Sequence, residues 1–292
     1  MTPSFPPLTR RGLIVLGAAT AAGCTSHDDA ATPVTTPTPS MPTQTSSPTP
    51  VAPSTPAAPQ WPTREAIVAK YGKIVPREWG LETSGLVLKQ PSKHVCLTFD
   101  ACGGPYGSKI DSDLIAVLRK NKAKATLFLN RRWIEANPKL AAELAHDPLF
   151  DLQNHGTKHL PLSVNGRKGY AEQGTHNVGE VYDEVMGNVE TLTKLTGRRP
   201  RFFRSGTAHV DEVAAKIVRE LGMLPTNFSV NGDAGTTFTR SQIIQEMRPT
   251  KAGDIVIGHM NQPRNATSEG MAVAIPALIA KGVTFAHLRD VL

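Results

Sequence analysis

Residues 95–100 read VCLTFD, an apolar and β-prone run that ends at an acid, Asp100. Such a run predicts a strand that is buried on both faces, as in a parallel sheet. The chain continues with a short glycine-rich stretch, ACGGP at residues 101–105, and then with apolar positions at helical spacing over residues 111–120. A buried strand, a loop and a helix together form one unit of an α/β fold.

The same alternation continues toward the C-terminus. Further strands are predicted at residues 125–129, 149–152, 202–204, 226–230, 255–258 and 283–285. Helices are predicted at residues 138–145, 179–196, 210–221, 240–247 and 271–280. Regular alternation of buried strands with helices predicts a parallel sheet, here closed as a barrel.

Polar or charged residues stand at or just beyond the carboxyl ends of the predicted strands. They are Asp100, His155, Arg204, Asp233 and His259. Barrel enzymes place their catalytic groups at this end of the sheet. We therefore expect these five side chains to approach one another.

The stretch NHGTKH at residues 154–159 contains His155 and His159, four positions apart. On a short helical turn their imidazoles would converge on one point. Neutral imidazole is a good ligand for zinc and its neighbours in the first transition row. The spacing alone fits two surface or core histidines as well, and the polar residues at the neighbouring strand ends favour the metal site.

Residues 1–24 have the pattern of an export signal. Arg10 and Arg11 form a twin-arginine pair ahead of an apolar run that is too short to span a bilayer. Cys24 looks like the lipid-attachment cysteine of a bacterial lipoprotein, and the alternative is cleavage near Ala22 with an unmodified cysteine. We expect an extracytoplasmic protein held at the membrane by a lipid on Cys24, or a secreted one without that lipid.

Residues 25–60 are almost entirely Thr, Pro, Ser and Ala, which predicts a disordered linker. Residues 61–292 then have the length of a single domain. The formal net charge of +7 suits an anionic envelope polymer as well as nucleic acid, but export argues against nucleic acid. We expect a monomer that is attached to the membrane.

The motifs of the predicted domain resemble, in their order, those of the polysaccharide deacetylases. They are Thr98-Phe99-Asp100, His155-x-x-x-His159, Arg204 in the run FRSGT at residues 203–207, Asp233, and Ile257-Gly258-His259. This family, carbohydrate esterase family 4, has the NodB-homology fold, a distorted (β/α) barrel. The resemblance covers the chain from residue 95 onward, and it implies removal of N-acetyl groups from peptidoglycan or another GlcNAc polymer.

The resemblance also implies catalytic roles. Asp100 would be the general base and Arg204 would orient it as a bidentate partner. His259 would be the general acid, kept protonated by Asp233, and the backbone N–H of Thr207 would contact the oxyanion. Partial burial should raise the pKa of Asp100 toward the operating pH. The alternatives are a helix N-cap for Asp100 and a surface contact for Arg204.

His155 and His159 would hold a divalent metal, zinc or another first-row transition metal. In the family a second aspartate follows the base and supplies the third protein ligand, but this chain has Ala101 there. The tryptophan usual in the fourth motif is also absent from residues 231–235. We therefore expect weaker metal binding than at a three-ligand site. Three candidates for the replacement ligand stay open, namely Asp100, Asp151 and Cys102.

Two further questions stay open at this point. Export permits a disulfide between Cys96 and Cys102, but their positions in the sequence do not require one. A glycan-binding protein with a degenerate metal site is one alternative function, and a hydrolase of another C–N bond or of an O-acetyl ester is the other. The set of Asp100, Arg204 and His259 favours an enzyme, because binding alone needs no general acid.

Overall fold

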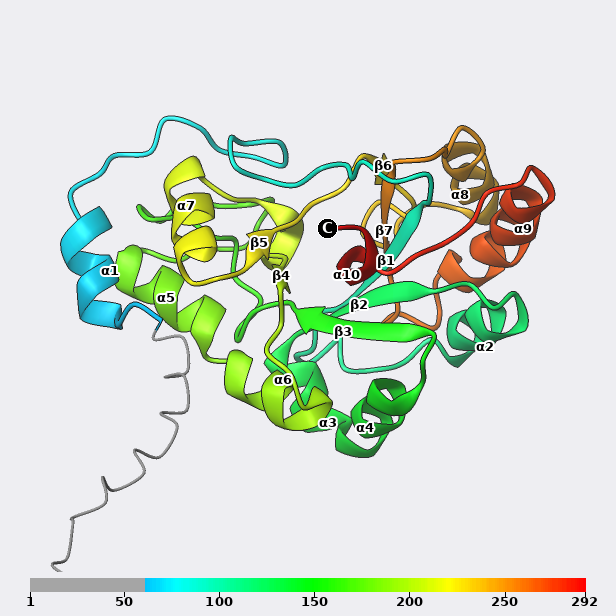
Figure 1. The fold of residues 1–292 in the computed structure, drawn as a ribbon, viewed down its shortest axis with the longest axis horizontal. Helices are drawn as coiled ribbons and strands as arrows, with labels where there is room; N and C mark the ends of the chain where they lie inside the picture. Colours follow the sequence, from blue (N-terminus) through cyan, green and yellow to red (C-terminus); the bar gives the residue numbers. More distant parts are fainter. Residues whose placement is uncertain (1–60) are drawn as a thin grey trace, which may run out of the picture. The chain divides into compact units, whose positions relative to one another are not determined.

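The computed structural model describes residues 61–292, which are shown as a coloured ribbon in Figure 1. The predicted export signal, the predicted linker and Cys24 lie outside the described residues. Within the described part, no helix combines the length and the apolar character needed to cross a membrane.

Seven parallel strands form one curled sheet in the order β5-β4-β3-β2-β1-β7-β6. The strands are β1 Cys96–Ala101, β2 Ala125–Leu129, β3 Phe150–Asn154, β4 Phe202–Phe203, β5 Leu224–Pro225, β6 Val230–Asn231 and β7 Ile255–His259. Among residues 61–292 no pairing joins β5 to β6, so the sheet is a half-barrel and not a closed one. This confirms the distorted (β/α) barrel, although the predicted closure does not occur.

Helices cover the outer side of the sheet (Figure 1). Their bounds are α1 Arg64–Tyr71, α2 Ser112–Lys120, α3 Arg131–Ala136, α4 Pro138–His146, α5 Val178–Met186, α6 Val189–Thr196, α7 Glu212–Glu220, α8 Arg240–Met247, α9 Thr267–Ala280 and α10 Leu288–Val291. Helices α2, α8 and α9 lie together beside β1 and β7, and α1, α5 and α7 lie together beside β4 and β5. The short α10 packs against the inner side, where Leu288 lies in a small cluster with Phe128.

The central strand β1 has two faces with different surroundings. Leu97, Phe99 and Ala101 belong to the apolar core between the sheet and the helices. Thr98 and Asp100 point the other way, into the half-barrel, where both accept hydrogen bonds from a buried arginine. This alternation follows from the pleat of a strand, in which successive side chains point to opposite faces. The side chain at position 101 is therefore directed away from the site.

The predicted helix at residues 179–196 is in fact two helices, α5 and α6. The chain breaks at Gly187 and Asn188, and the Asn188 side chain is fully buried. Its amide donates to the carbonyl oxygen of Leu129 and to the Asn154 side chain. These two contacts with the ends of β2 and β3 fix the break, and they join parts of the chain far apart in the sequence.

The predictions for two late strands were wrong. Residues 226–230 do not form one strand, because β5 ends before them and β6 begins at their end. The carbonyl oxygens of Thr226 and Asn227 instead accept hydrogen bonds from Arg204. Residues 283–285 contribute a single bridge, between Phe285 and Val95.

Candidate functional site

The carboxyl ends of the strands surround a cavity of about 1000 Å³. Four of the residues singled out in the sequence line it, namely Asp100, His155, His159 and His259. Two others, Arg204 and Asp233, are fully buried behind the wall and contact Asp100 and His259. The structure thus brings together all six residues that the motifs indicated.

Asp100 is held by Arg204, whose side chain is completely buried. One guanidinium N–H group of Arg204 donates to Asp100 Oδ1 over 2.7 Å, and the same nitrogen reaches Thr98 Oγ1. The other guanidinium nitrogens donate to backbone carbonyls, so the pair is not bidentate as expected. Asp100 Oδ2 stays free of Arg204 and lies 3.7 Å from His155 Nε2. Arg204 therefore engages Oδ1 and leaves Oδ2 of Asp100 available on the side of the cavity, which Asp100 lines.

The expected rise in the pKa of Asp100 does not occur. Burial by itself raises the pKa of this carboxyl, but its electrostatic interactions, above all the one with Arg204, outweigh it and lower the pKa below its ordinary value. The expectation rested on burial alone, although the motifs also pair Asp100 with Arg204, whose positive charge lowers the pKa of the carboxyl. Asp100 is consequently ionised at neutral pH.

His259, at the end of β7, is paired with Asp233. Nδ1 of His259 lies 2.9 Å from Asp233 Oδ1, while Oδ2 accepts the His259 backbone N–H and the Thr267 hydroxyl. Burial lowers the pKa of His259, but the Asp233 carboxylate more than offsets this and raises it to about 10. The imidazole is therefore protonated at neutral pH, and it lies beside Asp100 because the two residues are register partners on β1 and β7.

His155 and His159 come from the loop after β3 and not from a helical turn. The loop contains two residues with positive φ, Gly156 at 79° and His159 at 66°. The two imidazole rings nevertheless meet edge to face, with their centroids 4.9 Å apart. Their convergence thus depends on the loop conformation and not on the helical spacing from which it was expected.

Two buried side chains that the sequence analysis missed hold this loop. Glu184 on α5 accepts hydrogen bonds from the backbone N–H groups of Thr157, Lys158 and Leu160. Asn130 donates its amide to the carbonyl oxygens of His155 and Gly156. A Cβ atom on Gly156 would collide with the Glu184 carboxylate, which explains the glycine. The signal available in the sequence was a glutamate that shares the apolar face of its helix with Val181 and Val185.

Both histidines leave Nε2 available to a ligand, because Nδ1 of each ring has a partner within the protein. Nδ1 of His155 lies 3.0 Å from the carbonyl oxygen of Arg204, which only accepts, so this nitrogen carries the proton. Nδ1 of His159 lies 3.2 Å from the Glu172 carboxylate. In each ring Nε2 is left as the ligand atom, and carboxylate or carbonyl partners of this kind commonly orient metal-binding histidines.

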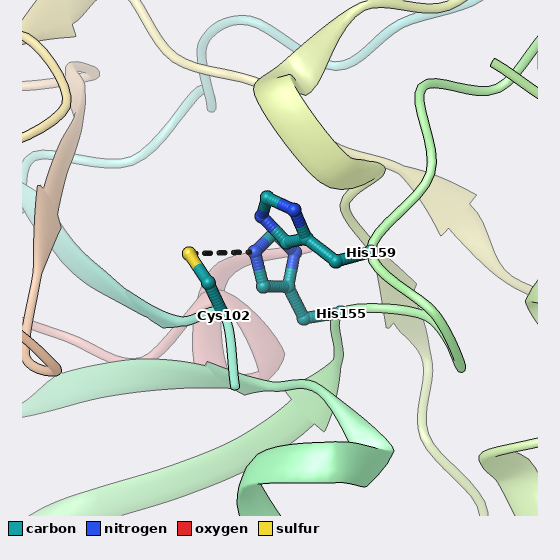
Figure 2. A group of neighbouring side chains, drawn as sticks. All are labelled: Cys102, His155 and His159. Atoms are coloured by element: carbon teal, nitrogen blue, oxygen red, sulfur yellow. Dashed lines mark hydrogen bonds between the residues drawn. The ribbon is translucent and has the colours of Figure 1, made fainter. Parts of the chain in front are cut away.

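Cys102 approaches the same point. Its Sγ lies 3.8 Å from His155 Nε2, and one ligand atom from each of Cys102, His155 and His159 lies within 4.8 Å of the other two. Figure 2 shows these three side chains directed toward one another. Burial alone would raise the pKa of the Cys102 thiol, but His159 and His155 lower it to about 5. One thiolate and two imidazoles are a donor set that suits a divalent transition metal.

Asp151, another candidate for the third ligand, is excluded. Its carboxylate lies in β3 away from the cavity and bonds to Arg198 and Arg289. The disulfide is excluded as well, because Cys96 and Cys102 are both free. Six residues of extended chain separate these cysteines by about 20 Å, far beyond the reach of a disulfide.

Thr207 lines the cavity in a strained backbone conformation. Its φ is 56° and that of the following Ala208 is 59°, in a region that non-glycine residues rarely adopt. Two such residues in succession cost on the order of 1–3 kcal/mol each, and strain of this kind concentrates at functional sites. This geometry fits the expected use of the Thr207 backbone in the site.

The fold, with its polar groups gathered at the carboxyl ends of parallel strands, has the architecture of a barrel enzyme. Residues 88–225 match the family model described as polysaccharide deacetylase. This match supports a polysaccharide deacetylase domain, and the solved structures with a similar fold include two family 4 carbohydrate esterases, from Bacillus anthracis and Bacillus subtilis.

Two solved structures illustrate the range of proteins with this fold. The Bc1960 peptidoglycan N-acetylglucosamine deacetylase is 21% identical, with a TM-score of 0.61 over 71% of this chain and 92% of that one. BA3943, a family 4 pseudoenzyme from Bacillus anthracis, is 20% identical, with a TM-score of 0.58 over 72% of this chain and 69% of that one. At these identities the likeness establishes the fold alone.

A curated relative is the uncharacterized protein YlxY of Bacillus subtilis (strain 168), 18% identical over 191 residues and 64% of this chain. The match spans 54% of the length of that protein. Since the fold occurs in deacetylases and in pseudoenzymes alike, activity has to be argued from the site.

Proposed function

We propose that this protein is a metal-dependent hydrolase that removes N-acetyl groups from a cell-envelope glycan, peptidoglycan or another GlcNAc polymer. One observation carries the proposal. An ionised carboxylate, Asp100, and a protonated imidazole, His259, lie on neighbouring strands at one cavity, beside the cluster of His155 and His159. Hydrolysis of an amide needs a base and an acid in these two states at the same time.

The roles of the side chains follow from their free atoms. Asp100 Oδ2 takes a proton from the attacking water while Arg204 holds Oδ1 in place. As the C–N bond breaks, His259 Nε2 gives a proton to the leaving amine, since Nδ1 is engaged with Asp233. A divalent ion held by His155 and His159 would polarise the acetyl carbonyl and lower the pKa of water. The products are acetate and a free amino sugar.

The rim of the cavity supports a glycan substrate. Tyr106 and Tyr170 both line it, and they are 89% and 77% exposed. The flat faces of exposed aromatic rings suit the apolar faces of sugar rings. The cavity is also at the upper end of the volumes usual for small-ligand sites.

The proposal places the enzyme outside the cytoplasm. The twin-arginine pattern at Arg10 and Arg11 and the lipobox-like pattern at Cys24 support export and a lipid anchor. The proline-rich residues 25–60 would then tether the catalytic domain to the membrane at a distance that reaches the glycan.

Acetate release tests the proposal. The protein should release acetate from N-acetylated chito-oligosaccharide or from peptidoglycan, and a chelator should stop it. Asp100→Asn should reduce turnover about 10²–10⁴-fold, the usual effect of losing a general base, with little change in substrate binding. A folded protein that binds glycan without acetate release would instead be a binding protein. Release from O-acetyl esters alone would show a different hydrolase.

A further inference from the structure

We infer that Cys102 is the third protein ligand of the metal, so that a thiolate takes the place of the aspartate usual in the family. The site would then prefer a thiophilic ion such as zinc over a hard ion such as manganese. This inference rests on the metal site of the proposed function, but it does not require that the protein be a deacetylase.

The distances fit a metal between these side chains. Tetrahedral zinc with Zn–S near 2.3 Å and Zn–N near 2.05 Å sets the sulfur and nitrogen atoms about 3.5 Å apart. The distance from Cys102 Sγ to His155 Nε2 is 3.8 Å, close to that value. His159 lies in the same cluster, and its ring meets that of His155 edge to face. Figure 2 shows the sulfur and the two rings turned toward a common point.

The register of β1 explains why the ligand is residue 102 and not residue 101. Asp100 points into the half-barrel, and Ala101 points into the core beneath the helices. By alternation the next side chain, Cys102, returns to the face that carries Asp100. The base and the sulfur therefore share one side of the strand, while Ala101 is on the other.

The peptide group that follows Cys102 is held by hydrogen bonds on both of its polar atoms. The carbonyl oxygen of Cys102 accepts a hydrogen bond from Arg132, and the N–H of Gly103 donates to Gly107. Gly103 has φ of 69°, and a Cβ there would lie 2.6 Å from the backbone nitrogen of Trp133. Only glycine fits this turn, which directs the chain away immediately after Cys102 and leaves its side chain at the site.

The two histidines are already oriented to bind a metal ion together with Cys102. The His155 Nδ1 proton goes to the Arg204 carbonyl, so the lone pair of Nε2 faces the sulfur. Glu172 occupies Nδ1 of His159 in the same way. One thiolate with two imidazoles leaves a fourth position for a non-protein ligand, as catalytic zinc sites do. Thiolate is also the donor that discriminates most strongly between soft and hard ions.

Cobalt(II) spectroscopy tests the assignment without any assay of activity. The full chain carrying Cys24→Ser serves as background, so that Cys96 and Cys102 are its two thiols. It is compared with further changes of Cys102→Ser, Cys102→Asp and, as a matched control, Cys96→Ala. Each protein is dialysed against cobalt, its bound metal is counted, and its near-ultraviolet spectrum is recorded. Thermal melts run alongside identify any variant that fails to fold.

The background and Cys96→Ala should bind about one cobalt ion and show the intense thiolate-to-cobalt charge-transfer band. Cys102→Ser should lose the band and bind cobalt at least about tenfold more weakly. Cys102→Asp should keep the ion without the band and should shift the preference from zinc toward manganese. If Cys102→Ser does not fold, the spectra of the background and of Cys102→Asp still decide whether Cys102 binds the metal.

Two results would overturn the inference, and the second would also refute the proposed function. Cobalt bound by the background without the band, or a band that survives in Cys102→Asp, would remove Cys102 from the site and leave the metal on His155 and His159. A folded background that binds no cobalt would refute the metal site as a whole, and the proposed hydrolase with it.

Discussion

The pair of Asp233 and His259 offers the sharpest test of the acid–base assignment. Asp233 Oδ1 lies 2.9 Å from His259 Nδ1, and the carboxylate is fully buried. Its charge holds the pKa of His259 at about 10, against the lowering effect of burial. Asp233→Asn keeps the size and one hydrogen-bonding oxygen but removes the charge. The pKa of His259 should then fall to its ordinary value near 6.5 or below it.

The size of the effect depends on pH. With a pKa near 6.5, only about 3% of the imidazole is protonated at about pH 8, so turnover should fall about 30-fold. At about pH 6 most of the imidazole still carries its proton, and the loss should be less than about twofold. A raised pKa keeps the acid active until pH passes the raised value. The alkaline limb of the profile should therefore move from about pH 10 to below about pH 7.

The assay is kcat for acetate release from an N-acetylated oligosaccharide as a function of pH. Thr267→Val is the matched control, because it removes a hydrogen bond to the same Asp233 oxygen but leaves the charge. The control should keep the alkaline limb of the wild type. If folded Asp233→Asn keeps that limb too, then His259 is not the acid or Asp233 does not set its pKa.

The remaining predictions concern Ala101 and Cys24. Ala101→Asp should destabilise the fold by several kcal/mol and should not tighten metal binding, because the new carboxylate would lie in the apolar core beneath the helices. Denaturant unfolding and zinc titration would check this, and a stable variant with tighter zinc binding would contradict the orientation of β1. Cys24→Ser should move the protein from the membrane fraction to the soluble fraction, as judged by fractionation and immunoblotting. Persistence in the membrane would show that Cys24 carries no lipid anchor.

Much of the fold could be predicted because its central strands are continuous apolar runs. β1, β2 and β7 begin and end within one residue of the predicted ranges. Burial on both faces of a strand selects apolar residues, whichever strands and helices pack against it. The break between α5 and α6 could not be found this way. It depends on Asn188 and its contacts with Leu129 and Asn154, which exist only when the chain is folded.

The site shows the same division between local and tertiary information. Motif order selected Asp100 and His259, but the direction of the pKa shift at Asp100 depends on a buried arginine more than 100 residues away. Among the three candidate ligands, the sequence alone could not separate Cys102, which lies beside the two histidines, from Asp151, which points away from the cavity. Alternation from Asp100 along β1 was a signal already present in the sequence, and it favours position 102 over position 101.

The acid and the base could neutralise each other if they were alone, since Asp100 and His259 are partners on adjacent strands. Each instead has a second, oppositely charged neighbour, Arg204 for Asp100 and Asp233 for His259. The four groups form a row of alternating charge, and the attraction within the row lowers the pKa of Asp100 while raising that of His259. Burial strengthens these interactions because little water screens them. The outer pair thus keeps the inner pair in the protonation states that the proposed hydrolysis requires.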